Sequence, residues 1–284
     1  MAVFPILLLA LAPSAPSGAA DGVVWRPGFG RAALWNDGMA EVSLYEATDV
    51  KYGIPRASRA ALIVVAENLG KETLVKPDRA AGEPATIRVL KLNHVRSIPT
   101  GAYTYQQMLS VFAGADRLDP VKLTMTSHEW CGNSFVEWRA DRATLSIRSY
   151  FEQPGEADLP LSPAGALFYD ALPLSLRGLD FARTRVGAVR VIDSVFGSRP
   201  LAPATETAAL EVVPPPSLPG IYRVVLRRGE RRDSLDFESA FPHRLTRWER
   251  SDGGSMRLTT SRRSRYWEKN APGDEQLLSA PAAR

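Results

Sequence analysis

The sequence predicts a mainly β fold, in the form of a strongly curved antiparallel sheet or open barrel with one or two packing helices. Segments rich in Val, Ile, Thr and aromatic residues recur along most of the chain, and these residue types favour strands. Turn residues separate the segments at intervals of about ten residues, which is typical of an antiparallel meander rather than of βαβ units. Helical periodicity is scarce.

The first group of expected strands lies before residue 152. Apolar and polar residues alternate over residues 40–52, and residues 56–67 have the compact apolar centre of a strand buried on both faces. Residues 103–112 carry apolar side chains at helical spacing, but their Tyr, Val and Phe content suits a strand nearly as well. The expected strands of this group are 40–52, 56–67, 86–98, 121–130, 134–138 and 143–151.

A helix and a second group of strands follow. Ser162 can cap a helix over residues 163–170, extending toward Leu179, because Pro163 would then occupy the first helical position. Residues 229–230 and 252–254 predict hairpin turns. The expected strands are 187–196, 207–213, 222–228, 233–238, 244–250 and 255–261, and the expected loops are 77–84, 153–163, 198–203 and 214–219.

The N-terminus predicts export. Residues 1–20 contain no charged side chain, and a short apolar run is followed by Pro, Ser, Gly and Ala, the pattern of a signal peptide cleaved near Ala20. The run is shorter than the ~20 residues that cross a bilayer. We therefore expect residues 1–20 to be a signal peptide and residues 21–284 to be one β-rich domain, with a possible seam at 153–163. The mature chain should be periplasmic or extracellular and lack a transmembrane segment.

Composition limits the partners. The chain has 45% hydrophobic residues, a net charge of +4 and one cysteine, Cys131, so an intramolecular disulfide is excluded. Nucleic acid is not expected as a partner. Four arginines flank a predicted turn and are interpreted either as solvated strand ends or as a peripheral contact with acidic lipid or polysaccharide: Arg227, Arg228, Arg231 and Arg232.

The stretch TMTSHEWCGNSFVEW, residues 124–138, is the most crowded with reactive side chains. We expect a hairpin with its turn at Gly132 and Asn133, which would pair Cys131 with Ser134 and His128 with Glu137. Side chains on a strand alternate between faces, so His128 and Cys131 should point to opposite sides of the sheet and cannot form a thiolate–imidazole pair. We expect Cys131 to be a buried structural residue.

The more apolar face of this hairpin should point inward and supplies the candidate ligand contacts: Glu129, Trp138, Cys131 and Met125. Glu129 is the exception on that face, because a buried carboxylate needs a partner or a raised pKa. It is either paired with an arginine or in contact with a ligand. The opposite face supplies secondary candidates, His128, Trp130 and Glu137.

Several familiar chemistries are not expected. Gly132 stands where an HExxH zinc motif needs its second histidine, and no GxSxG or P-loop motif occurs. The glycines at 28 and 30 resemble a dinucleotide fingerprint, but no strand precedes them. We therefore expect no catalytic residue, no metal site and no cofactor.

Five segments resemble a family of exported bacterial proteins: LWNDGMAEVSLYEA, VLKLNHVRSIPTGAYTYQQMLSVF, LTMTSHEWCGNSF, PHRLTRWE and RYWEKN. The resemblance covers about residues 34–270, and EWCG is its most specific part. Some members carry the label septum formation inhibitor Maf, which we interpret as a misassignment, because Maf proteins are cytosolic α/β nucleotide pyrophosphatases. The resemblance implies an exported β-sheet domain of unknown function and supplies no active-site residues.

These patterns favour a binding or carrier protein of the cell envelope for a small apolar or lipid-like ligand, such as a lipid or glycolipid. One alternative is an exported hydrolase or transferase that uses Glu129 with His128, His94 or Cys131, which requires these groups to converge. Another is an envelope scaffolding protein.

Overall fold

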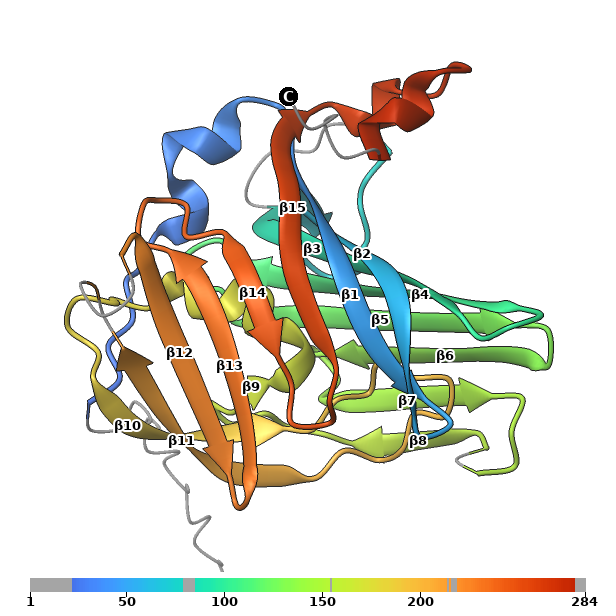
Figure 1. Cartoon of the computed structure of the whole chain (residues 1–284). Helices are drawn as coiled ribbons and strands as arrows, with labels where there is room; N and C mark the ends of the chain where they lie inside the picture. Colours follow the sequence, from blue (N-terminus) through green and yellow to red (C-terminus); the bar gives the residue numbers. More distant parts are fainter. Residues whose placement is uncertain (1–21, 79–84, 154, 214, 216–218, 279–284) are drawn as a thin grey trace, which may run out of the picture.

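A single, mostly antiparallel sheet of fifteen strands forms the described part of the protein (Figure 1). The computed structural model describes residues 22–78, 85–153, 155–213, 215 and 219–278. The expected signal peptide therefore lies outside the described residues. The strands are β1 (Ala40–Lys51), β2 (Ile54–Gly70), β3 (Thr86–Pro99), β4 (Thr104–Gly114), β5 (Pro120–Glu129), β6 (Gly132–Arg139), β7 (Thr144–Ser149), β8 (Ala157–Pro160), β9 (Leu167–Phe168), β10 (Val186–Ile192), β11 (Thr205–Val213), β12 (Ile221–Arg228), β13 (Arg231–Glu238), β14 (Leu245–Glu249) and β15 (Ser255–Ser264).

The strand order shows how the sheet is assembled. It runs from β8 back to β1, continues through β15, and ends at β10 and β9. Two meanders therefore meet where β1 pairs antiparallel with β15, with Ala40 opposite Ser264. Only β9 and β10 pair in parallel within the described part of the sheet. The ends of the sheet do not pair with each other, so the barrel-like sheet stays open, and the predicted fold class is confirmed.

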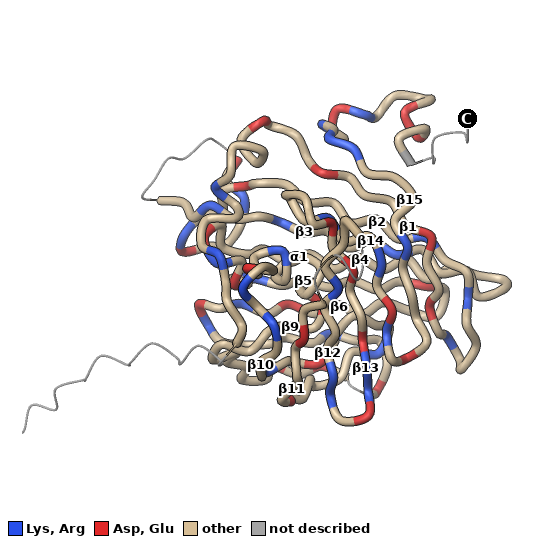
Figure 2. Tube along the Cα trace, turned by 60° about the vertical axis from the view of Figure 1, so that its left-hand side comes forward, with Lys and Arg blue, Asp and Glu red and all other residues tan. Residues whose placement is uncertain are grey.

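A buried segment fills the concave side of the sheet. It contains β9, the short helix α1 (Leu172–Ser175) and 3-10 turns at Tyr169–Ala171 and Leu176–Gly178. Figure 2 shows α1 inside the ring of strands. Leu172, Leu174 and Leu176 are fully buried there. Among the described residues, no helix has the length and apolar character needed to cross a bilayer.

Three details differ from the sequence predictions. The helix begins at Leu172 rather than at Pro163, because residues 163–165 form a turn and Leu167 joins the sheet as part of β9. Residues 104–114 are strand β4, paired with β3, so the helical alternative for 103–112 is wrong. Part of the expected loop 153–163 is strand β8. β4 and β8 pair with the strands that precede them, β3 and β7, and β9 pairs with β10. Strand pairing, which local periodicity does not report, therefore decides these segments.

The hairpin of β5 and β6 has a different register from the one predicted. Glu129 pairs with Gly132 and His128 with Asn133, so the turn is at Trp130 and Cys131. The observed pairing of β5 with β6 is shifted from the predicted pairing by an even number of residues. Because side chains alternate between the two faces of a strand, each side chain stays on its predicted face. Met125 and Trp138 do point inward. Cys131 is exposed at the turn, so the expectation that it is buried was wrong.

A buried ion pair fixes the filling segment to the sheet. Both terminal nitrogens of Arg177 donate hydrogen bonds to the two carboxylate oxygens of Glu41 on β1, each at 2.9 Å. The side chains are 3% and 5% exposed. Arg177 Nε donates to the carbonyl oxygen of Pro242 at 2.8 Å. The guanidinium therefore has three fixed acceptors, which compensates for its removal from water.

Substituting one partner of this pair should destabilise the fold strongly. In the Arg177→Met variant the Glu41 carboxylate stays buried without its cation, and the expected loss is about 3–5 kcal/mol in the free energy of unfolding, measured in urea. The double variant Glu41→Leu with Arg177→Met should recover much of that loss. The control is Arg257→Met, because Arg257 and Glu46 form an exposed pair (70% and 68%) and should contribute at most about 1 kcal/mol. Equal losses in Arg177→Met and Arg257→Met would contradict the anchoring role.

Candidate functional site

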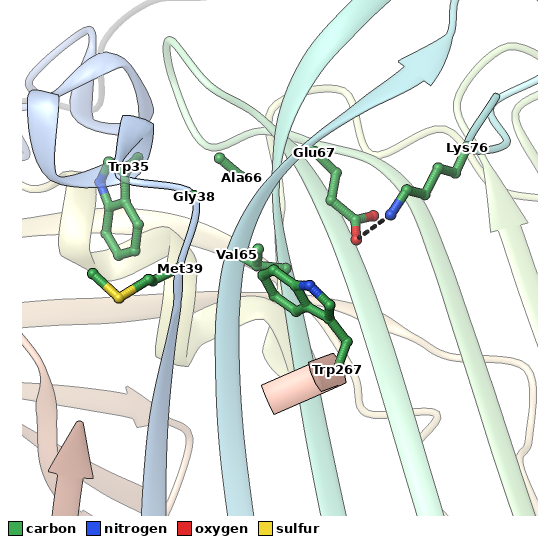
Figure 3. Close-up of a pocket in the computed structure, with 8 residues that line it drawn as sticks. All are labelled: Trp35, Gly38, Met39, Val65, Ala66, Glu67, Lys76 and Trp267. Atoms are coloured by element: carbon green, nitrogen blue, oxygen red, sulfur yellow. Dashed lines mark ion pairs between the residues drawn. The ribbon is translucent and has the colours of Figure 1, made fainter. Parts of the chain in front are cut away.

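A pocket of about 230 Å³ opens where the chain enters and leaves the middle of the sheet (Figure 3). Because Ala40 pairs with Ser264, the residues before β1 and after β15 leave the sheet side by side. The first contribute Trp35 and Met39 and the second contribute Trp267. The lining residues are Trp35, Gly38, Met39, Val65, Ala66, Glu67, Lys76 and Trp267.

Trp35 forms a rigid wall of the pocket. It lies in a 3-10 turn, Ala33–Asn36, and is only 3% exposed. The guanidinium carbons of Arg177 and Arg263 lie 5.5 and 5.3 Å from its ring centroid, within the range of cation–π attraction. Arg263 is fixed in turn by Asp37, whose pKa is lowered mainly by its hydrogen bond with that arginine.

Trp267 forms the opposite, more open wall. It lies in the 3-10 turn Tyr266–Glu268 after β15, and it is 48% exposed. Its ring packs edge-on against Tyr266 with centroids 5.3 Å apart. In Figure 3 the Trp267 ring lies beside Val65, while the Met39 side chain lies beneath Trp35. The apolar part of the lining between the two indoles is therefore formed by Met39, Val65 and Ala66.

The polar side of the pocket is a three-membered charge cluster. Glu67 Oε1 accepts a hydrogen bond from Lys91 Nζ at 2.8 Å and lies 3.7 Å from Lys76 Nζ. Lys91 is largely covered (17% exposed), whereas the Lys76 side chain is 71% exposed. One carboxylate faces two ammonium groups, so the cluster carries one net positive charge beside the apolar side chains of the pocket.

The structure places the primary sequence candidates in two different environments. Met125 and Trp138 are buried in the main core, and Trp138 Nε1 donates to the carbonyl oxygen of Leu161 at 2.9 Å. Glu129 lies at the end of β5, and its carboxylate accepts the backbone N–H of Cys131 at 2.7 Å. The carboxylate thus caps its own turn. A ligand contact by these four residues stays a prediction.

His128 and Glu137 lie on the convex face, whereas Trp130 lies at the turn between β5 and β6. His128 is exposed there, and Trp130 is 78% exposed at the turn. Glu137 forms an ion pair with Lys122 at 2.9 Å, not with His128 as the predicted register required. Trp130 stacks on Tyr103 with ring centroids 6.0 Å apart and planes inclined by 29°.

Of the groups named in the enzyme alternative, Glu129 and Cys131 lie together at the turn between β5 and β6, but the two histidines do not join them. His94 is buried on the concave side, and His128 is exposed on the convex side. His94 pairs with Leu109 on β4, and Leu109 pairs with Met125 on β5. Met125 is therefore the residue of β5 that lies in line with His94 across the sheet. Glu129 is four residues further along, about 13 Å at ~3.3 Å per residue. This separation exceeds the reach of direct acid–base cooperation. The described residues also contain no group of three or more His, Cys, Asp or Glu side chains that could hold a metal ion.

A buried charge cluster lies inside the sheet near the ends of β1 and β3. Asp49 pairs with Arg96 at 3.0 Å and with Arg250 at 2.9 Å, and it accepts a hydrogen bond from Ser58 at 2.8 Å. Although burial opposes ionisation, these partners lower the pKa of Asp49. His94 lies beside the cluster, 2% exposed, and its Nε2 has no hydrogen-bond partner among the described residues.

The arginine-rich turn between β12 and β13 is largely paired with carboxylates. Arg228 is buried and forms ion pairs with Asp193 at 2.8 Å and Asp233 at 3.2 Å. Arg231 pairs with Glu206, and Arg227 lies 3.8 Å from Glu211. Figure 2 shows the acidic and basic positions interspersed at this hairpin. The pairing reduces the positive charge that the turn can present to an anionic surface.

Sequence reasoning did not find the pocket. Trp35 and Trp267 stand in segments without strand or helix periodicity, at opposite ends of the described chain. Only the pairing of β1 with β15 brings them together. The available signal was weak: Trp35 precedes the predicted strand 40–52, Trp267 follows the predicted strand 255–261, and the sequence does not show which two strands pair.

The fold defines the chain as a β protein built on one open, barrel-like sheet. No family model matches the chain, and no curated protein matches it. The label septum formation inhibitor Maf is therefore not supported, whereas the β-sheet domain that the resemblance implies agrees with the fold. One similar solved structure is a β-barrel-like protein of a domain of unknown function, DUF1849, from Brucella abortus, with 11% identity and a TM-score of 0.47, covering 80% of this chain and 98% of that chain.

The buried His94 should make stability depend on pH. Burial, with smaller effects of Arg96 and Arg250, holds the pKa of His94 well below its usual value, while Asp49 opposes this shift. In the unfolded chain the ring takes up a proton below about pH 6.5, whereas the folded ring stays neutral. Wild-type stability should therefore fall, relative to His94→Gln, by up to about 1.4 kcal/mol per pH unit below pH 6.5. Urea unfolding at several pH values measures this difference. His128→Gln, at an exposed position, is the control, and parallel profiles for wild type and His94→Gln would disprove the effect.

The exposed thiol should react, but slowly. The hydrogen bond and negative charge of Glu129 raise the pKa of Cys131, so less thiolate is present at neutral pH than in a free cysteine. Native protein should react completely with Ellman's reagent, and Glu129→Gln should react faster at pH 7. Glu137→Gln should keep the wild-type rate, because Glu137 pairs with Lys122. An unreactive thiol in the native protein would contradict the exposed turn.

Proposed function

We propose that the protein is an exported, non-catalytic binding protein that holds the apolar part of a small amphiphile in the pocket between Trp35 and Trp267. The observation that carries this proposal is a hollow of mixed polarity, with apolar side chains between two indole rings and a net positive charge cluster at one side. Export is the prediction from residues 1–20, and it would place such a protein among the lipids and glycolipids of the envelope.

The dimensions of the pocket indicate how much of a ligand it takes. Clefts that enclose most of a drug-sized ligand measure about 300–1,000 Å³, and this pocket measures about 230 Å³. It would therefore enclose one end of a longer molecule, such as a terminal stretch of an acyl chain, while the remainder stays outside. Trp267 supplies a flat apolar contact, and the buried Trp35 bounds the other side of the pocket without losing conformational entropy, because it is already fixed.

The charge cluster favours an anionic head group. Lys76 shares Glu67 with Lys91, which is the nearer partner at 2.8 Å against 3.7 Å. The exposed Lys76 can therefore turn from Glu67 toward a carboxylate or phosphate without leaving Glu67 unpaired. A medium-chain fatty acid combines the two required features, and we take decanoate as the probe.

Decanoate should bind to the protein in isothermal titration calorimetry. Trp267→Ala should weaken this binding about tenfold, since the loss of one aromatic wall costs about 1–2 kcal/mol. Lys76→Met should weaken decanoate binding by up to about 1 kcal/mol, as expected for an exposed ion pair, but leave the binding of decanol unchanged. The difference between the two ligands separates the charge of Lys76 from its apolar stem.

Trp130→Ala is the matched control, because Trp130 is also an exposed tryptophan but lies at the turn of β5 and β6, away from the pocket lining. It should bind decanoate like the wild type. Absence of decanoate binding, or equal affinities of wild type and Trp267→Ala, would refute the proposed function.

A further inference from the structure

The convex face of β3, β4, β5 and β6 carries two parallel rows of side chains. The first row, level across the four strands, is mainly apolar and consists of Val95, Met108, Thr126 and Phe135. The second row lies two residues nearer to the β5–β6 turn and is polar. It consists of Ser97, Gln106, His128 and Asn133. Each row spans about 14 Å, three strand spacings of about 4.8 Å.

These rows are open to solvent and surround a shallow hollow. Met108 and Phe135 are 41% and 39% exposed, unusually high for large apolar side chains in the middle of a sheet face. A hollow of about 290 Å³ lies between the rows, lined in part by Gln106, Thr126 and His128. The surface is therefore an apolar strip beside a hydrogen-bonding strip.

The polar row has unused hydrogen-bonding capacity. Gln106 donates one hydrogen bond from Nε2 to Ser97 Oγ at 3.3 Å. Within the described residues, the His128 ring and the Asn133 side-chain amide form no hydrogen bond. A ligand with several hydroxyl groups could satisfy these donors and acceptors, whereas a bare hydrocarbon chain would leave them unpaired.

Exposed aromatic rings stand at the end of the polar row. Trp130 follows His128 by two residues and stacks on Tyr103. The Tyr103 hydroxyl lies 2.6 Å from that of Tyr52, which also lies 2.6 Å from the Tyr105 hydroxyl. This network fixes the support under Trp130, so the indole forms a prearranged platform with one face toward solvent.

The chemistry of this surface restricts its ligand. All four strands are hydrogen-bonded on both sides, so the face offers side chains only and cannot add a peptide strand. Neither row contains a carboxylate or a permanently charged cation. The nearest cations stand at the ends of the rows: Arg59 beside Ser97, and Arg148, which is paired with Asp158, beside Phe135. The middle of the face therefore offers a strongly charged ligand no counter-charge. A flat ring with one apolar face and hydroxyl groups at its edge matches both rows.

We propose that the convex face of β3–β6, ending at Trp130, binds an uncharged oligosaccharide. The sugar rings pack on Trp130 and along the strip of Met108 and Phe135, while their hydroxyl groups bond to Gln106, His128 and Asn133. This site is separate from the pocket between Trp35 and Trp267 and does not depend on the function proposed for that pocket.

The test is calorimetric titration of the full chain with four neutral hexasaccharides: chitohexaose, cellohexaose, maltohexaose and laminarihexaose. At least one should bind, and its affinity should change little between low and high salt, because no ion pair is involved. Trp130→Ala and Gln106→Ala should each weaken binding about tenfold. Both residues are exposed, so the variants should fold, which circular dichroism verifies. Trp267→Ala should bind the sugar like the wild type, even if it loses decanoate.

Two results would overturn the proposal. One is that none of the four sugars binds, or that Trp130→Ala binds them unchanged. The other is that the wild type attaches through Trp130 to vesicles of neutral phosphatidylcholine and not to the sugars, which would make the aromatic end a membrane contact instead.

Discussion

The fold depends on the filling of the concave side of the sheet by a segment of its own chain. A sheet of fifteen strands curves far enough to enclose a space, and that space must be occupied by side chains if the apolar inner face is to leave water. The segment around α1 supplies Leu172, Leu174 and Leu176 for this purpose. Arg177 fixes its position through Glu41. The same arginine lies over Trp35, so the ion pair that positions the core also supports one wall of the pocket.

The interior is divided into an apolar and a charged region. The inward positions at the start of β3 and the end of β4 are apolar, as in Leu90, Leu92 and Val111, whereas further along β3 the inward residues are His94 and Arg96. Asp49 lies between two arginines, and Arg250 also pairs with Asp252 at 3.3 Å, so the two guanidinium groups face two carboxylates. Phe196 adds contacts to Arg96, because its carbonyl oxygen accepts from Arg96 and its ring lies 3.7 Å from the same guanidinium carbon. The loop after β10 thus covers charges that would otherwise contact water.

Much of the fold could be predicted from local patterns, because alternation and turn residues report directly on strands. The long strands, the inward faces of Met125 and Trp138 and the hairpin between β12 and β13 follow from such patterns. The register of β5 and β6 could not be predicted from Gly132 and Asn133 alone. Both registers point Val136 and Trp138 inward, so the apolar pattern does not distinguish them. The helix at Leu172 was misplaced because tertiary contacts, not capping by Ser162, decide where it begins. The pocket and the convex face result from strand pairing, which a single sequence does not encode locally.

The pairing of β1 with β15 has a consequence for the order in which the protein can fold. β1 can pair with β2 as soon as both have been synthesised, but its other edge must wait for β15, roughly 200 residues later. At about 5–20 residues per second, that delay is on the order of 10–40 s. During this interval a twelve-residue edge with unpaired backbone groups is a template for unwanted association. A chain of this topology therefore requires either protection of its nascent form or a late, concerted closure of the two meanders.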